Sequence, residues 1–236
     1  MRYFLILFLN LNLTSSTLIF ADMPSSQRLE KVINKTTPLL KKSLKAKGFR
    51  LGAPLYLRIF KEEAILEVWL KQKKQFKLFK TYPICTFSGK LGPKQKEGDY
   101  QAPEGFYFVK AQQLNPYSRF HLSFNLGYPN QYDRAHHRTG SALMVHGNCV
   151  SMGCYAMTDK KIEEIYLLAH YALQYGQSYF RVHIFPFKMT VKNLQKHKKS
   201  PWADFWFNLK TGYDWFEQHQ YNPPNIEVKN QRYIFN

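Results

Sequence analysis

The feature that most constrains the fold is a series of three segments in which apolar residues recur with a period of two. Residues 55–60, 64–70 and 76–82 are rich in β-branched and aromatic side chains, and charged turns separate them. Such alternation is typical of strands with one buried face, and short turns join antiparallel neighbours. The pattern therefore predicts an antiparallel meander. With 236 residues, of which 44% are apolar, the chain can bury a core without disulfide staples or a structural metal.

Helical periodicity flanks the meander on both sides. Residues 26–47 carry apolar side chains at helical spacing, and Pro38 inside this pattern predicts a broken helix, or two, packed on the domain that follows. Residues 162–176 repeat apolar side chains at the same spacing, and Thr158 and Asp159 are suited to cap that helix. Further strands are expected at 106–109, 142–145 and 180–185, and loops at 88–105 and 128–140.

The last part of the chain is basic and aromatic. One helical stretch, 202–216, contains seven aromatic side chains: Trp202, Phe205, Trp206, Phe207, Tyr213, Trp215 and Phe216. A stripe of this kind is more often core or docking surface than a platform for stacking sugars. We therefore expect it to pack on the rest of the protein.

The first 21 residues resemble a secretory signal peptide. A basic residue precedes an apolar run, and the small residue Ala21 stands before Asp22. Polar residues interrupt the run, so it lacks the roughly 18 consecutive apolar residues of a spanning helix; they are Asn10, Asn12, Thr14, Ser15 and Ser16. We therefore expect export to the periplasm, with an uncleaved membrane anchor as the alternative.

The charge of the chain points to an anionic partner. It has 34 Lys and Arg against 16 Asp and Glu, a net charge of +18, which becomes +17 when Arg2 leaves with the signal peptide. No helix-turn-helix, zinc-finger or RNP signature is present, and an exported protein rarely meets nucleic acid, so nucleic acid is not expected. A carboxylate-rich cell-wall polymer or an anionic membrane face fits better. The alternative is that the lysines near 71–77 only solvate one hairpin.

A cluster with reactive side chains lies between the expected strand at 142–145 and the capped helix. Cys154 stands a few residues before the helix N-terminus, whose positive dipole would lower the pKa of the thiol and favour the thiolate. His146 ends the preceding strand and can approach as a general base. The backbone N–H groups of Gly153 and Cys154 are candidate oxyanion-hole donors. The cluster predicts a cysteine nucleophile.

Two structural readings of the same cluster remain open. One histidine and two cysteines could bind zinc, although no fourth ligand stands at a familiar spacing. Cys149 and Cys154 could form a disulfide. Because the three cysteines are odd in number, one thiol is left over, and Cys149 is either free or joined to Cys85 if Cys154 is the nucleophile.

These residues resemble a known signature. The pattern His146-Gly147-x3-Ser151-x-Gly153-Cys154 is similar to that of the YkuD-type L,D-transpeptidase catalytic domain. Upstream, residues 102–107 (Ala-Pro-Glu-Gly-Phe-Tyr) resemble the Thr-Pro-x-Gly-x-Phe segment of that family. With the loop at 128–130 and the basic C-terminal extension, the resemblance is closest to the YafK-like branch and covers residues 53–187.

The resemblance implies a fold and an organisation. The expected fold class is α+β, with a mixed, mainly antiparallel, β-rich catalytic domain and helical additions at both ends. The expected divisions are a signal peptide at 1–21, a helical segment at 22–52, the catalytic domain at 53–187 and the basic extension at 188–236. No cofactor and no metal are expected.

The resemblance also implies roles for individual residues. Cys154 would be the nucleophile, His146 its general base, and Gly147 the turn whose backbone orients the imidazole, while Ser151 and Gly153 shape the loop. Two positions depart from the family: Met152 replaces a His or Arg, and Ala156 replaces an Arg that holds the carboxylate of the donor. The expected substrate-binding residues are Tyr128, Asn130, Arg134 and Arg138. Arg134, Arg138 or Lys94 would bind the carboxylate of the donor in place of the missing Arg.

The function that follows is peptidoglycan L,D-transpeptidation. Cys154 would attack the bond between diaminopimelate and D-alanine in a tetrapeptide stem, D-alanine would leave, and an amine would resolve the thioester. If water resolves it, the protein is instead an amidase that detaches stem-linked groups such as a wall-linked lipoprotein. A third hypothesis is a wall-binding module with an idle cysteine.

Overall fold

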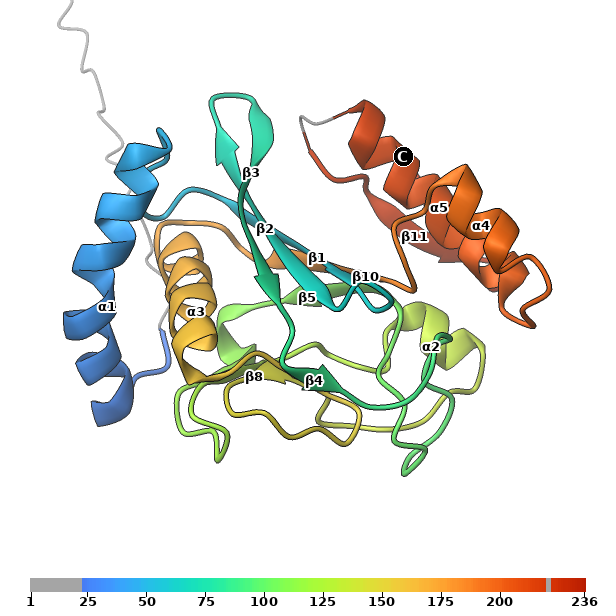
Figure 1. The fold of residues 1–236 in the computed structure, drawn as a ribbon, viewed down its shortest axis with the longest axis horizontal. Coiled ribbons are helices and arrows are strands. Elements are labelled where there is room, and N and C mark those ends of the chain that lie inside the picture. Colours follow the sequence, from blue (N-terminus) through green and yellow to red (C-terminus); the bar gives the residue numbers. More distant parts are fainter. Residues whose placement is uncertain (1–22, 220–221) are drawn as a thin grey trace, which may run out of the picture.

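The core of the protein is built on two five-stranded sheets (Figure 1). The computed structural model describes residues 23–219 and 222–236, so the predicted signal peptide at 1–21 lies outside the described residues. The first sheet has the order β3-β2-β1-β10-β5. Its strands are β1 (Leu55–Phe60), β2 (Ile65–Gln72), β3 (Gln75–Pro83), β5 (Gly105–Val109) and β10 (Phe180–Phe185). The predicted meander is confirmed as β1, β2 and β3, which pair antiparallel.

The second sheet carries the cluster identified from the sequence. Its order is β4-β9-β8-β7-β6. The strands are short: β4 (Thr86–Phe87), β6 (Leu114–Asn115), β7 (Ser123–Asn125), β8 (Met144–His146) and β9 (Tyr155–Ala156), with a 3-10 turn η1 (Ala111–Gln113) before β6. Two pairs of neighbours are parallel, β1 with β10 and β8 with β9, and the others are antiparallel. The expected mixed, mainly antiparallel α+β fold is thereby confirmed.

Two helices cover one side of the sheets. Helix α3 (Asp159–Gln174) contacts β1 of the first sheet and β7 and β8 of the second, and α1 (Gln27–Ala46) packs beside α3 (Figure 1). The prediction that Pro38 breaks the first helix is wrong, because α1 runs through it. The buried face of α1 includes Val32 before the proline and Leu40 after it. Packing of both halves on α3 outweighs the lost backbone hydrogen bond.

The opposite face of the first sheet is covered by the C-terminal part of the chain. This part consists of α4 (Val191–Lys196), α5 (Ala203–Gln218) and the hairpin β11 (Ile226–Lys229) and β12 (Arg232–Phe235) (Figure 1). As a result every residue of β1 is buried. Leu57 faces the core around α3, whereas the ring of Tyr56 lies 4.6 Å from that of Phe216 in α5. The expectation that the aromatic stripe packs on the protein is confirmed.

Within the described part of the chain, no helix is both long and apolar enough to cross a membrane.

Candidate active site

The second sheet places His146 at the end of β8 and Cys154 directly before the neighbouring strand β9. In the parallel pair β8 and β9, Val145 lies opposite Tyr155 and His146 opposite Ala156. Cys154 directly precedes β9, and its sulfur accepts a hydrogen bond from the backbone N–H of Met144 at 3.4 Å. Met144 and His146 project from the same face of β8, because side chains alternate along a strand. Because Ala156 is the register partner of His146, Cys154 is offset from His146 by two residues in this strand pair.

His146 is held in one orientation. Its side chain is 1% exposed, its ring packs at 4.5 Å from that of Phe120, and Nδ1 lies 2.6 Å from the carbonyl oxygen of Gly147. A carbonyl only accepts hydrogen bonds, so Nδ1 is the protonated nitrogen and Nε2 keeps the free lone pair. Burial lowers the pKa of His146 below its ordinary value of 6.5. The imidazole is therefore neutral at neutral pH, with Nε2 available as a base.

Cys154 carries the free thiol of the protein, and it is buried. Burial raises its pKa above the ordinary value of 9.0, against smaller opposing effects of the Met144 N–H and the charge of Lys94. The predicted lowering by the helix dipole is thus wrong. Strand β9 separates Cys154 from the first residue of α3, and the Thr158 side chain makes no capping bond. No hydrogen bond joins His146 to Cys154 in the described structure, so the resting pair is a neutral thiol and a neutral imidazole.

A disulfide between Cys85 and Cys149 anchors the loop that connects the two reactive residues. This pairing was one of two open possibilities, and it excludes both a Cys149–Cys154 bond and a zinc site that uses Cys149. Asp159, which we expected to cap α3, instead accepts a hydrogen bond from the backbone N–H of Asn148 at 2.7 Å. The first half of the loop is therefore tied both to β4 and to α3.

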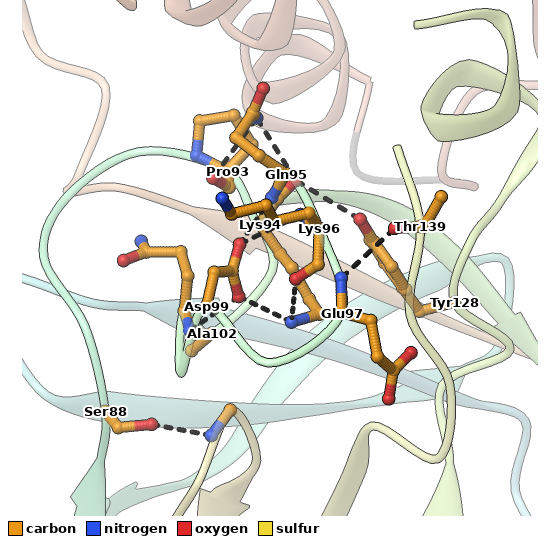
Figure 2. A network of polar contacts seen from close by, with 12 residues as sticks. Ser88, Pro93, Lys94, Gln95, Lys96, Glu97, Asp99, Ala102, Tyr128 and Thr139 are labelled. Atoms are coloured by element: carbon orange, nitrogen blue, oxygen red, sulfur yellow. Dashed lines mark hydrogen bonds and ion pairs between the residues drawn. The ribbon is translucent and has the colours of Figure 1, made fainter. Parts of the chain in front are cut away.

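The second half of the loop is held by a residue that the sequence did not single out. The backbone N–H of Gly153 donates to the hydroxyl of Ser88 at 2.6 Å, a contact visible in Figure 2. Ser151 in turn donates to the carbonyl oxygen of Cys154 at 2.7 Å. The N–H of Gly153, predicted as an oxyanion-hole donor, is thus engaged by Ser88 in this state. The signal in the sequence that could have brought Ser88 to this loop is the pairing of Cys85 with Cys149, one of the possibilities left open above.

A buried lysine, Lys61, binds the segment that carries Ser88 and Lys94. The ammonium of Lys61 donates to the carbonyl oxygens of Gly92 and Ala102 at 2.9 and 3.1 Å, and lies 3.1 Å from the carboxylate of Glu104. Both side chains of this ion pair are fully buried. Because a buried charge that loses its partner is costly, this arrangement holds the segment in one conformation.

The predicted substrate-binding residues divide into two groups. Arg138 is buried, and it donates to the carboxylate of Asp133 at 2.9 Å. Asn130 caps α2 (Gln131–Ala135), a short helix inside the expected 128–140 loop, and its amide also donates to the Tyr233 hydroxyl at 2.9 Å. Lys94 is buried and bound to Asp99 at 2.5 Å (Figure 2). These three side chains are held by partners within the protein, which corrects the expectation that Arg138 and Lys94 are free for a carboxylate.

Tyr128 and Arg134 line an open groove of about 840 Å³ that leads toward the thiol. The same groove is lined by Ala142 and Met144, the two residues whose backbone atoms contact the sulfur of Cys154. Arg134 is exposed, and its guanidinium contacts the carbonyl oxygen of Pro129. Of the predicted cations, Arg134 is therefore the one that the fold leaves accessible in the groove.

Comparisons with known proteins show what this chain is similar to. The family model of the L,D-transpeptidase catalytic domain (YkuD) matches residues 55–174. A protein of Escherichia coli K12 named "Putative L,D-transpeptidase YafK" is 49% identical over 199 residues, which cover 84% of this chain and 79% of that protein. Among solved structures, the helical cell shape determining protein Pgp2 from Campylobacter jejuni is 16% identical, with a TM-score of 0.45, over 81% of this chain and 80% of its own.

Proposed function

This chain belongs to the L,D-transpeptidase catalytic domain family, and from that premise we propose that it is an exported enzyme of peptidoglycan biogenesis and remodelling. Cys154 forms an acyl-enzyme with a tetrapeptide stem and passes the acyl group to an amine. The observation that carries the proposal is the free Cys154 thiol directly before β9, the strand beside His146, whose Nδ1–H donates to the Gly147 carbonyl. This arrangement provides one nucleophile and one base, the imidazole of His146, whose proton is on Nδ1 and whose Nε2 is free to accept another.

The chemistry follows from the protonation states. Because thiol and imidazole are both neutral at rest, Nε2 of His146 removes the thiol proton as sulfur attacks the carbonyl carbon of diaminopimelate. The bond to D-alanine breaks, and the proton on His146 goes to the departing amine. The acceptor amine then loses a proton to Nε2 and attacks the thioester, which forms the new amide bond and frees the thiol.

Water is the competing acceptor. With water, the same two residues make an amidase or hydrolase, for which a stem-linked lipoprotein is one substrate class. The nucleophile loop is exposed at Val150 (51%) and Met152 (76%), next to the buried Cys154. The proposed location is the periplasm, where both acceptors occur.

Mass spectrometry of a tetrapeptide muropeptide, with and without an amine acceptor, tests the proposal. We expect an adduct on Cys154, release of D-alanine, and a new amide product that requires the amine. Cys154→Ala should abolish the adduct, whereas Met152→Leu, in the same exposed loop, should retain it. Release of D-alanine with only hydrolysed product would favour the amidase.

The wall-binding hypothesis is tested by sedimentation with purified sacculi. Equal binding by wild type and Cys154→Ser, with no D-alanine released by either, would support a non-catalytic module and contradict the enzyme. An adduct mapped to a cysteine other than Cys154 would contradict the assignment of the nucleophile.

A further inference from the structure

A second groove adjoins the first one, which Tyr128 and Met144 line. It has a volume of about 540 Å³ and lies between β5, α2 and the C-terminal hairpin of β11 and β12. Gln113, Gly127 and Arg134 line both grooves. The two grooves therefore meet at these residues, and a ligand that occupies one can extend into the other past Arg134.

The linings share one chemical character. None of the described residues that line the two grooves is acidic, although the chain has 16 Asp and Glu. The charged lining residues are Lys110 and Arg134, both basic. Six amide side chains also line them: Gln112, Gln113, Asn115, Asn125, Asn130 and Gln131. Bonds within the protein hold the amides of Gln113 and Asn130 and the Oδ1 atoms of Asn115 and Asn125, so the amides of Gln112 and Gln131 are the ones left for a ligand in the described structure. Guanidinium and amide groups are the partners of carboxylates and peptide bonds, so the charge and chemistry of both grooves suit an acidic peptide.

The second groove also has an apolar wall. Ile226 and Val228 of β11 line it, together with Phe108 of β5. Such side chains accommodate the methyl and methylene groups of a peptide while the amides bind its backbone. The alternate residues of β11, Glu227 and Lys229, do not line the groove and pair with each other at 2.8 Å.

This wall is held rigidly against the rest of the protein. Asn208 of α5 makes two reciprocal bonds to the backbone of Tyr233, at 2.8 and 2.9 Å. The ring of Tyr233 stacks on that of Tyr132 at 4.3 Å, and its hydroxyl accepts from Asn130 of α2. A preformed wall spares a ligand the entropy cost of ordering it. The hairpin of β11 and β12 is therefore a fixed part of the groove wall.

We propose that the second groove binds the peptide on the amine side of the bond that Cys154 makes or breaks, with Arg134 on a carboxylate of that peptide and Val228 on its apolar atoms. The proposal rests on the proposed function, in which the acyl-side stem occupies the first groove, where Ala142 and Met144 lie against the sulfur of Cys154. It assigns acceptor recognition to the C-terminal hairpin, more than 70 residues after the nucleophile in the chain.

Binding of a soluble stem tripeptide tests the site without turnover. This peptide ends in diaminopimelate and offers an amine and carboxylates, but it has no D-alanine and cannot acylate the thiol. Arg134→Gln should raise its Kd about ten- to a hundredfold, since hydrogen bonds to a charged group are lost, and Val228→Asn should raise it severalfold. The matched controls Arg232→Gln and Lys229→Gln, on the same hairpin and outside the groove, should bind as wild type does.

A peptide with its carboxylates amidated should bind weakly and be insensitive to Arg134→Gln. The proposal is overturned if Arg134→Gln and Val228→Asn bind the tripeptide as tightly as wild type, or if Lys229→Gln weakens binding as much as Val228→Asn. Because this readout requires no acyl-enzyme, a failure of the proposed chemistry leaves it interpretable.

A second measurement separates the two grooves in the working enzyme. Val228→Asn should acylate with a tetrapeptide donor at the wild-type rate and transfer normally to glycine, a small amine. Transfer to the tripeptide should fall severalfold. Slower acylation by Val228→Asn would place the hairpin on the acyl side and contradict the assignment.

Discussion

The backbone N–H of Gly153 donates to the hydroxyl of Ser88 at 2.6 Å, across 65 residues of chain. Three residues before Ser88, Cys85 forms the disulfide with Cys149. The short segment 85–88 therefore holds the nucleophile loop at two points, one on each side of Ser151. The position of Cys154 depends on this segment as much as on its own neighbours in the chain.

Ser88→Ala should slow acylation of Cys154 by about ten- to a hundredfold, since small displacements of a reacting group cost up to about 10² in rate. In Ser88→Ala the N–H of Gly153 loses its hydrogen-bond acceptor. The loop is then no longer fixed at the residue that directly precedes Cys154. Ser88→Thr keeps the hydroxyl and should restore most of the rate. Single-turnover acylation followed by intact mass measures both variants. Equal rates for Ser88→Ala and wild type would show that the contact does not position the loop.

Removal of the disulfide should destabilise the protein without removing the free thiol. For the double variant Cys85→Ser and Cys149→Ser, the sequence separation of 64 corresponds to a loss of about 4 kcal/mol in the chain-entropy description. Urea unfolding measures the free energy, and Cys154 should remain open to alkylation in the folded variant. An unfolding free energy equal to that of wild type would contradict the expected stabilisation.

The thiol should alkylate slowly at neutral pH. Since burial raises the pKa of Cys154 above 9.0, the thiolate is scarce at pH 7 and its fraction increases as pH rises. The rate of reaction with iodoacetamide should therefore still be increasing at pH 9. A rate that is already maximal between pH 6 and 8 would indicate a preformed thiolate–imidazolium pair and contradict the neutral resting pair.

His146 should provide general-base catalysis that persists into mildly acidic solution. Burial lowers its pKa below 6.5, so the imidazole stays unprotonated at pH 6.5 and activity is lost only as pH falls through the lower value. His146→Ala should slow acylation by about 10² to 10⁴ at neutral pH. A pH–rate profile with an acid limb above pH 6.5, or a loss below about tenfold in His146→Ala, would contradict this role.

Local patterns in the sequence predicted much of the scaffold and the two central residues of the site. Strand β1 begins and ends at the predicted residues, 55 and 60, because alternation and turn residues act over a few neighbours. His146 and Cys154 were found from the spacing of His-Gly and Gly-Cys pairs. Strand β8, which ends at His146, does lie beside β9, which Cys154 directly precedes. The short helix α2 was missed, since five residues show too little periodicity.

Other features depended on residues far apart in the chain. Arg138 was predicted to be free for substrate, but it pairs with Asp133 only five residues away. That carboxylate is buried because α2 packs on β5, where the Tyr107 hydroxyl also donates to it. The helix dipole was predicted to lower the pKa of Cys154, but burial by surrounding segments dominates. A charge or a dipole is visible in sequence, whereas the desolvation that opposes it is a property of the packed interior.

By itself the sequence determined the strand and helix periods, the two reactive residue types and the excess of positive charge, because each of these follows from covalent order and local geometry. The tertiary structure alone decided the parallel pairing of β1 with β10, the partner of Cys149, the contact between Ser88 and Gly153, and the groove wall formed by β11. These contacts join segments separated by tens of residues or more. Which distant segments meet is decided by how the whole chain buries its apolar surface, and no local pattern encodes that choice.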